Sequence, residues 1–139
     1  MTSPAIHPGG CLCGRIRYEV RGNALQTSLC HCEDCRRASG APFVAWTFFL
    51  AEAVTYIQGT PKSFLFARRQ RFFCGDCGTP LQFHDTDDER FCEINTCSFD
   101  NPSVFPPSDQ CWVNDEIPWI HQIEKLPRFD VTSPLPGET

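Results

Sequence analysis

Three groups of closely spaced cysteines are the residues of this sequence best suited to chemistry. In chain order they are Cys11-x-Cys13, Cys30-x-Cys32-x-x-Cys35 and Cys74-x-x-Cys77. These groups hold seven of the ten cysteines in the chain. Zinc takes thiolates in a tetrahedral arrangement, commonly with two ligands from one tight turn and two from another. The spacing therefore indicates metal binding, with zinc as the expected metal.

The Cys74-x-x-Cys77 pair has the spacing of one half of a four-cysteine site. Its partner pair is most simply Cys11 and Cys13, because glycines on both sides of that pair free the backbone to bend around a metal. Four thiolates fill the coordination sphere and leave no room for a substrate. We expect a structural zinc here, joining the start of the first strand to the middle of the chain.

Cys30, Cys32 and Cys35 offer three thiolates within six residues, one ligand short of a closed site. Three protein ligands with one exchangeable position are typical of catalytic zinc. The sequence thus predicts a second zinc, with catalysis at these three cysteines. The fourth position is open to water, a substrate thiol, Cys97 or a histidine.

The remaining cysteines and histidines give weaker signals. Cys92 and Cys111 lack ligand spacing and are expected to be buried, inert thiols. Cys97 precedes an expected loop, so it is open to a role as a ligand or a reactive thiol. His31 could be a fourth ligand or a proton carrier, but because adjacent side chains rarely reach one metal together, it is expected either outside the coordination sphere or on the surface. The other histidines that could complete the site are His84 and His121.

Arg36 and Arg37 follow the last cysteine of the three-cysteine group. Guanidinium groups bind carboxylates well, so this pair is a candidate for holding an anionic substrate or cofactor beside the metal. A solvated helix face is the alternative interpretation.

Composition and charge exclude several classes of protein. A formal net charge of -5 and a pI near 5.3 argue against nucleic acid as a partner, because phosphate binding needs a surplus of Lys and Arg. The longest apolar stretch, residues 41–50, is far shorter than the roughly 20 residues of a membrane helix. Residues 1–10 lack the features of a secretory signal, so a cytoplasmic location is expected, where thiols stay reduced.

The elements that must position these cysteines are expected to be mainly β-strands. Short runs rich in aromatic and β-branched residues predict strands over 15–20, 25–29, 43–50, 54–57, 63–66, 71–73, 81–84 and 91–95. The best helical stretch is 34–39, ended by Gly40 and Pro42. Beyond residue 95 the chain is rich in proline and aromatic residues and is expected to pack back over the sheet.

One domain is expected over residues 1–139. Its core is expected over about 9–129, with 131–139 as a loose tail.

The cysteine groups and their flanking residues carry a resemblance to a known family. The matching motifs are Gly9-Gly10-Cys11-x-Cys13-Gly14, Cys30-His31-Cys32-x-x-Cys35-Arg36, Phe73-Cys74-x-x-Cys77-Gly78-Thr79-Pro80-Leu81, and a C-terminal Pro118-Trp119 followed by Leu126-Pro127-Arg128-Phe129. This pattern resembles the glutathione-dependent formaldehyde-activating enzyme family, also called the centromere protein V family. The resemblance covers about Gly9 to Phe129.

The resemblance implies a fold and an activity. It implies a β-tent fold of several short, curled antiparallel sheets with little helix. It implies a structural zinc on Cys11, Cys13, Cys74 and Cys77 and a second zinc on Cys30, Cys32 and Cys35. The implied reaction joins glutathione and formaldehyde into S-hydroxymethylglutathione, which is carbon-sulfur lyase chemistry.

Three hypotheses on function follow. The first is an enzyme that adds a small thiol, best glutathione, to an aldehyde, best formaldehyde, with Arg36 or Arg37 holding a substrate carboxylate. The second is a non-enzymatic zinc module that binds a protein partner, which a closed three-cysteine site would favour. The third is a thiol redox enzyme of the methionine sulfoxide reductase B type. It ranks last because the zinc site of those reductases uses two Cys-x-x-Cys pairs, an arrangement that this chain does not reproduce.

Overall fold

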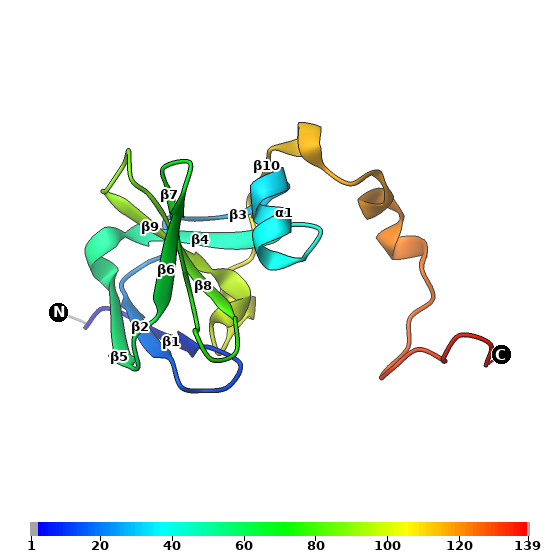
Figure 1. Ribbon diagram of the computed structural model, residues 1–139, viewed down its shortest axis with the longest axis horizontal. Coiled ribbons are helices and arrows are strands. Elements are labelled where there is room, and N and C mark those ends of the chain that lie inside the picture. The colour runs from blue at the N-terminus through cyan, green and yellow to red at the C-terminus, as the bar shows by residue number, and fades with distance from the viewer. Residues whose placement is uncertain (1–2, 139) are drawn as a thin grey trace.

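The computed structural model describes residues 3–138 and is mainly β, as predicted (Figure 1). Its strands are β1 (Ile6–Gly10), β2 (Arg17–Arg21), β3 (Gln26–Cys30), β4 (Val44–Leu50), β5 (Val54–Gln58), β6 (Lys62–Phe66), β7 (Arg69–Phe73), β8 (Pro80–Asp85), β9 (Phe91–Asn95) and β10 (Asp109–Cys111). Among the described residues, the one α-helix is α1 (Glu33–Ser39). Short 3-10 turns occupy Ala51–Ala53, Thr96–Ser98, Pro102–Val104, Val113–Asp115 and Pro118–Lys125.

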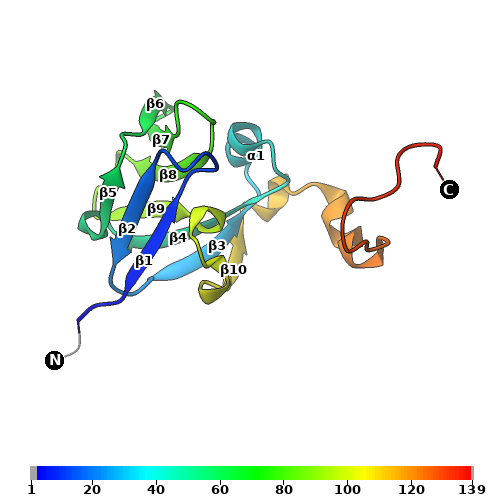
Figure 2. The same cartoon turned by 90° about the horizontal axis from the view of Figure 1, so that it is seen from below.

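The strands of residues 3–138 form two sheets. The small sheet has the order β1-β2-β5, and the large sheet has the order β10-β3-β4-β9-β8-β7-β6. Neighbouring strands are antiparallel except β10, which lies parallel to β3. The small sheet lies against one face of the large sheet (Figure 2).

The main core fills the space between the two sheets. It contains Tyr18 and Val20 from the small sheet and Phe49, Leu81 and Ile94 from the large sheet. Side chains alternate between the faces of a strand, so the residues between these positions point to the opposite face of the large sheet. That opposite face includes Trp46, Phe48 and Glu93 and carries the cavity described below.

Each predicted strand corresponds to an observed one, and the ends differ by two residues at most. Strands β1 and β10 were not predicted from the sequence. Strand β1 reads Ile-His-Pro-Gly-Gly, which contains the residues typical of turns rather than strands. It is nevertheless held by a five-residue antiparallel ladder with β2. Strand β10 has three residues, too few for a period to be seen.

The predicted helix is present, and α1 begins at Glu33, one residue earlier than expected. The Sγ of Cys32 accepts a hydrogen bond from the backbone N–H of Cys35 and so caps the first turn. Gly40 ends the helix with a left-handed φ of 69°, a conformation that glycine adopts without strain. The helix therefore holds two of the three clustered cysteines on one turn.

The segment after residue 95 packs against the sheets only in part. Phe99 and Phe105 are buried in the main core, and β10 adds to the edge of the large sheet. Residues 117–138, here called the C-terminal arm, leave the body of the molecule instead (Figure 1). Trp119 is 54% exposed and Phe129 is 53% exposed. The prediction that this part packs over the sheet is wrong, because its residues form short 3-10 turns and no strand that could extend the ladder.

Among residues 3–138, helices are too short or too polar to span a membrane.

Candidate metal centres and cavity

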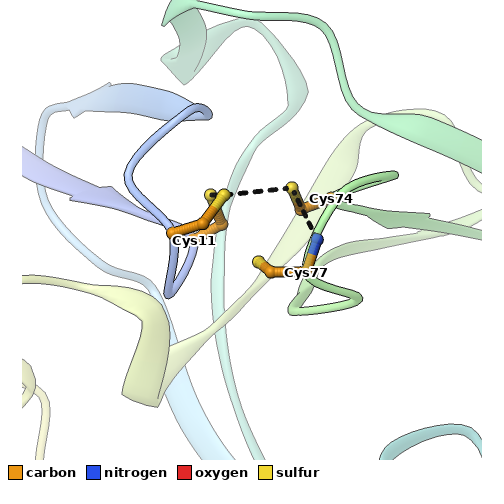
Figure 3. A group of neighbouring side chains, drawn as sticks. Cys11, Cys74 and Cys77 are labelled. Atoms are coloured by element: carbon orange, nitrogen blue, oxygen red, sulfur yellow. Dashed lines mark hydrogen bonds between the residues drawn. The ribbon is translucent and has the colours of Figure 1, made fainter.

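The turns after β1 and β7 bring four cysteines together. The side chains of Cys11, Cys74 and Cys77 turn toward one another (Figure 3), and Cys13 completes the group. All four Sγ atoms lie within 4.8 Å of one another. The Sγ of Cys13 is 3.5 Å from that of Cys11 and 3.8 Å from that of Cys74. The grouping predicted from the spacing is thus present in three dimensions.

Backbone amides are directed at the sulfurs of this four-cysteine group. The N–H of Ile16 donates to the Sγ of Cys11 at 3.2 Å. The N–H groups of Asp76 and Cys77 donate to the Sγ of Cys74 at 3.4 and 3.5 Å. Such donors stabilise a thiolate relative to a thiol. Against the effect of burial, the hydrogen bond from Ile16 helps to lower the pKa of Cys11, which favours the charged form that binds a metal.

Thr79 supports the same group from the side. Its hydroxyl accepts from the N–H of Leu12 at 3.0 Å, which ties the β1 loop to the turn after β7. The hydroxyl lies 3.2 Å from the Sγ of Cys77. Hydrogen bonds from the Thr79 side chain and backbone lower the pKa of Cys77 to about 5. Thr79 is therefore a link between the two halves of the group.

The second group lies where β3 leads into α1. Cys30 ends β3, Cys32 caps the helix and Cys35 lies in its first turn. Their Sγ atoms lie within 4.8 Å of one another. The thiol of Cys30 lowers the pKa of Cys35 to about 5, and Trp46, Cys32 and Arg71 act in the same direction against the effect of burial. Cys35 is thus the cysteine of this group that ionises most readily.

The donor sets of both groups suit zinc. Each group offers only sulfur ligands, which favour zinc over hard cations such as magnesium or calcium. Either group could hold a metal ion. In the part of the chain that the structure describes, neither Cys97 nor a histidine joins the three-cysteine group. His31 instead contacts Gln110, with its Nε2 2.8 Å from the amide oxygen.

A cavity of about 420 Å³ adjoins the three-cysteine group. Its walls come from the beginning of α1 and from the face of the large sheet turned away from the main core. Trp46, Phe48 and Phe83 contribute aromatic surface, and Cys30, Cys32 and Cys35 all lie on its lining. The four-cysteine group does not line this cavity. Of the two groups, the three-cysteine group is therefore the one with space for a small molecule.

Arg71 is a cation on the cavity wall that contacts the three-cysteine group. Its side chain is buried, with 9% of the residue exposed, and its Nη2 lies 3.8 Å from the Sγ of Cys35. Its guanidinium carbon lies 4.8 Å from the centre of the Phe83 ring, close enough for a cation-π contact. Arg69, two residues earlier on β7, is paired with Asp85. Among the described residues, Arg71 has no carboxylate partner, so its charge faces the thiolates and the cavity.

Arg36 and Arg37, predicted to hold an anionic group, do not line the cavity. The side chain of Arg37 is 78% exposed and pairs with Glu33. That pairing is the i to i+4 contact of an ordinary helix surface. The structure thus directs Arg37 toward solvent.

The cavity residues that were not identified as site residues from the sequence include Arg71, Glu93 and Cys111. Cys111 was expected to be buried, but it is half-buried and lies on the cavity wall. Cys111 lies across from Cys30 in the parallel ladder of β10 and β3, and its Sγ accepts from the Ser28 hydroxyl at 3.5 Å. The weak alternation within β7 and β9 could have indicated that Arg71 and Glu93 share a sheet face with aromatic residues. It could not have indicated which strands are neighbours.

Comparisons with known proteins add a family and a fold. A family model described as glutathione-dependent formaldehyde-activating enzyme matches residues 6–115. An uncharacterized lyase of Schizosaccharomyces pombe is 31% identical over 93 residues, which are 67% of this chain and 68% of that protein. A Rhodobacter sphaeroides protein of known crystal structure is similar with a TM-score of 0.60 at 20% identity, covering 74% of this chain and 98% of that one. The last likeness concerns the fold alone.

Proposed function

The chain belongs to the glutathione-dependent formaldehyde-activating enzyme family, and from this premise we propose that it is a zinc-dependent lyase acting on a small thiol and a small aldehyde. Glutathione and formaldehyde are the proposed pair, with S-hydroxymethylglutathione as the product. The observation that carries the proposal is the three-cysteine group, which opens onto a cavity of about 420 Å³. Cavities of this size are typical of small-molecule sites.

We assign different roles to the two cysteine groups. Cys11, Cys13, Cys74 and Cys77 would hold a structural zinc that fastens the β1 loop to the turn after β7. Cys30, Cys32 and Cys35 would hold the second zinc. When bound there, zinc would supply a position for the substrate thiol and lower the pKa of that thiol. A reducing compartment such as the cytoplasm would keep these thiols available.

The other cavity residues would bind and orient the substrates. The aromatic side chains of Trp46, Phe48 and Phe83 line the cavity. They would limit the water around bound substrates and so strengthen electrostatic interactions there. Arg71 would hold an anionic group of a substrate close to Cys35. The role predicted for Arg36 and Arg37 stays a prediction, and Arg71 is better placed for it.

The test is zinc content per chain together with catalysis. Exchange NMR would measure the rate of hemithioacetal formation from glutathione and formaldehyde above the uncatalysed rate. We expect about two zinc ions per chain in the wild type and about one in Cys32→Ser, with catalysis lost, because the three-cysteine group is the proposed catalytic site. Cys97→Ser is the matched control, since Cys97 is exposed and belongs to neither group.

The outcomes are distinct. Cys97→Ser should keep both the zinc and the rate of the wild type. A two-zinc wild-type protein that does not accelerate the reaction would contradict the proposed pair of substrates. A Cys32→Ser variant with full zinc content would contradict the assignment of the second site.

A further inference from the structure

Glu93 is an acid placed on the wall of the same cavity as the three-cysteine group. It lies in β9, directly across from Phe83 of β8 on one side and Phe48 of β4 on the other. Residues directly opposite in an antiparallel ladder share a face, so the carboxyl group stands between two aromatic side chains. The neighbouring Cys92 and Ile94 point the other way and are buried in the main core.

The carboxyl group of Glu93 is held without a partner. Among residues 3–138, the side chain of Glu93 forms no hydrogen bond and no ion pair. Other acids of the cavity differ from it, because Asp85 is paired with Arg69 and Glu33 with Arg37. Asp34 and Asp115 are exposed, whereas Glu93 is half-buried. Glu93 is therefore the acid of this cavity that is sheltered from solvent and free to exchange a proton.

The surroundings of Glu93 keep its carboxyl group protonated near neutral pH. Burial is the main cause that raises the pKa of Glu93 to about 8, and the negative charges of Cys35 in α1 and Asp85 in β8 add to the effect. Arg69 and Arg71 in β7 oppose it. Strand β4 faces it with aromatic residues only, Trp46 and Phe48. A carboxyl group in an apolar pocket is a common way to obtain an acid that works at neutral pH.

Adding a thiol to an aldehyde requires a proton to change place. The S–H bond and the carbonyl π bond break, while a C–S bond and an O–H bond form. The addition needs no outside oxidant or reductant. The only transfer that requires help is that of the proton from sulfur to oxygen. One carboxyl group can do both halves of this transfer and return to its starting state.

We propose that Glu93 carries the proton between the substrate thiol and the aldehyde oxygen. Its carboxyl group donates a proton to the aldehyde oxygen as the C–S bond forms, and the carboxylate left behind takes the proton that the attacking thiol gives up. In the reverse reaction the same group removes the proton from the hydroxyl and returns it to sulfur. This role rests on the proposed function and adds a residue that the cysteine motifs do not contain.

The first test compares two Glu→Gln substitutions. Glu93→Gln keeps the size of the side chain and removes its proton chemistry, and Glu52→Gln is the control because Glu52 is exposed and outside the cavity. General acid-base groups contribute about 10²- to 10⁴-fold, so Glu93→Gln should lose about 100-fold or more of the catalysed rate. Its zinc content should equal that of the wild type. Glu52→Gln should match the wild type in both.

The second test reads the proton of Glu93 directly. In protein with ¹³C-labelled glutamate side chains, carbon NMR should show one carboxyl group that titrates well above the usual range for glutamate. That signal should be absent from Glu93→Gln. The pH profile of the wild-type rate should carry the same ionisation, and the profile of Glu93→Gln should lack it.

The results separate this inference from the proposed function. If the wild type accelerates the reaction and zinc-loaded Glu93→Gln is equally fast, Glu93 does not carry the proton and the proposed function stands. If Glu93 titrates in the usual range for glutamate, the inference is overturned as well. If the wild type has no activity with glutathione and formaldehyde, the proposed function fails, and the proton role fails with it.

Discussion

At the scale of single residues, Arg71 shows how the cavity balances charge. Three thiolates and a divalent cation would leave one net negative charge in a partly buried place. A buried guanidinium is costly unless a negative group compensates it. Arg71 is buried, and its Nη2 lies 3.8 Å from the Sγ of Cys35. The cysteine group and Arg71 therefore stabilise each other.

This balance predicts that Arg71→Met weakens metal binding at the three-cysteine group. Removing a group that supports metal ligands typically costs about 10- to 100-fold in affinity or activity. We expect a loss of that size for the second zinc only. Competition with a chromophoric chelator would measure it, because the two zinc ions would then be released at different chelator concentrations.

Arg71→Lys is the matched variant. Lysine keeps the positive charge but cannot lie flat over the Phe83 ring or donate from a planar group. It should recover part of the lost affinity. Equal zinc affinity in Arg71→Met and the wild type would show that Arg71 serves the fold or a substrate rather than the metal site.

At the scale of elements, the sequence predicted what is local and missed what depends on strand neighbours. The cysteine groups could be assigned because each lies within a few residues and its spacing is itself the signal. Arg71 and Glu93 reach the cavity only because β7, β8, β9 and β4 are consecutive neighbours in the large sheet. That order is a long-range property which neither alternation nor composition contains.

Strand β1 illustrates the same limit. Its two glycines suggest a turn, yet Gly9 is required by packing in a strand. A Cβ atom at Gly9 would lie 2.3 Å from the hydroxyl oxygen of Tyr18 and 2.7 Å from the carbonyl oxygen of Ser98. Tyr18 is fully buried and its hydroxyl is 2.7 Å from that of Ser98, so neither neighbour has room to move.

We therefore expect Gly9→Ala to destabilise the protein by about 1–3 kcal/mol, the usual cost of overpacking a core. Urea unfolding with saturating zinc would measure it. The control is Gly75→Ala, where the atoms nearest to the added Cβ are methylene carbons of the flexible Lys62 side chain. Its loss should be clearly smaller. Equal losses for the two variants would mean that the packing around Tyr18 adjusts easily.

At the scale of the whole molecule, the body and the C-terminal arm differ in how much they contribute to the buried core. The body contains both sheets, both cysteine groups and the main core. The match to the family model ends at residue 115, close to the beginning of the arm. Within residues 117–138, the structure has no buried side chain. The arm therefore contributes little apolar burial to the stability of the body.

A chain that ends at Glu116 should then fold and bind zinc like the full chain. Because little surface is buried by the arm, we expect the midpoint of thermal unfolding to change by less than about 4 °C, which corresponds to about 1 kcal/mol or less in a protein of this size. Calorimetry and zinc analysis of the two proteins would test this, and limited proteolysis should cut the full chain within 117–138 before it cuts the sheets. A large fall in the midpoint would mean that the exposed aromatic residues of the arm, such as Trp119 and Phe129, pack against the body or another copy in solution. The expected result would show that the first 116 residues are sufficient for folding and for both metal sites.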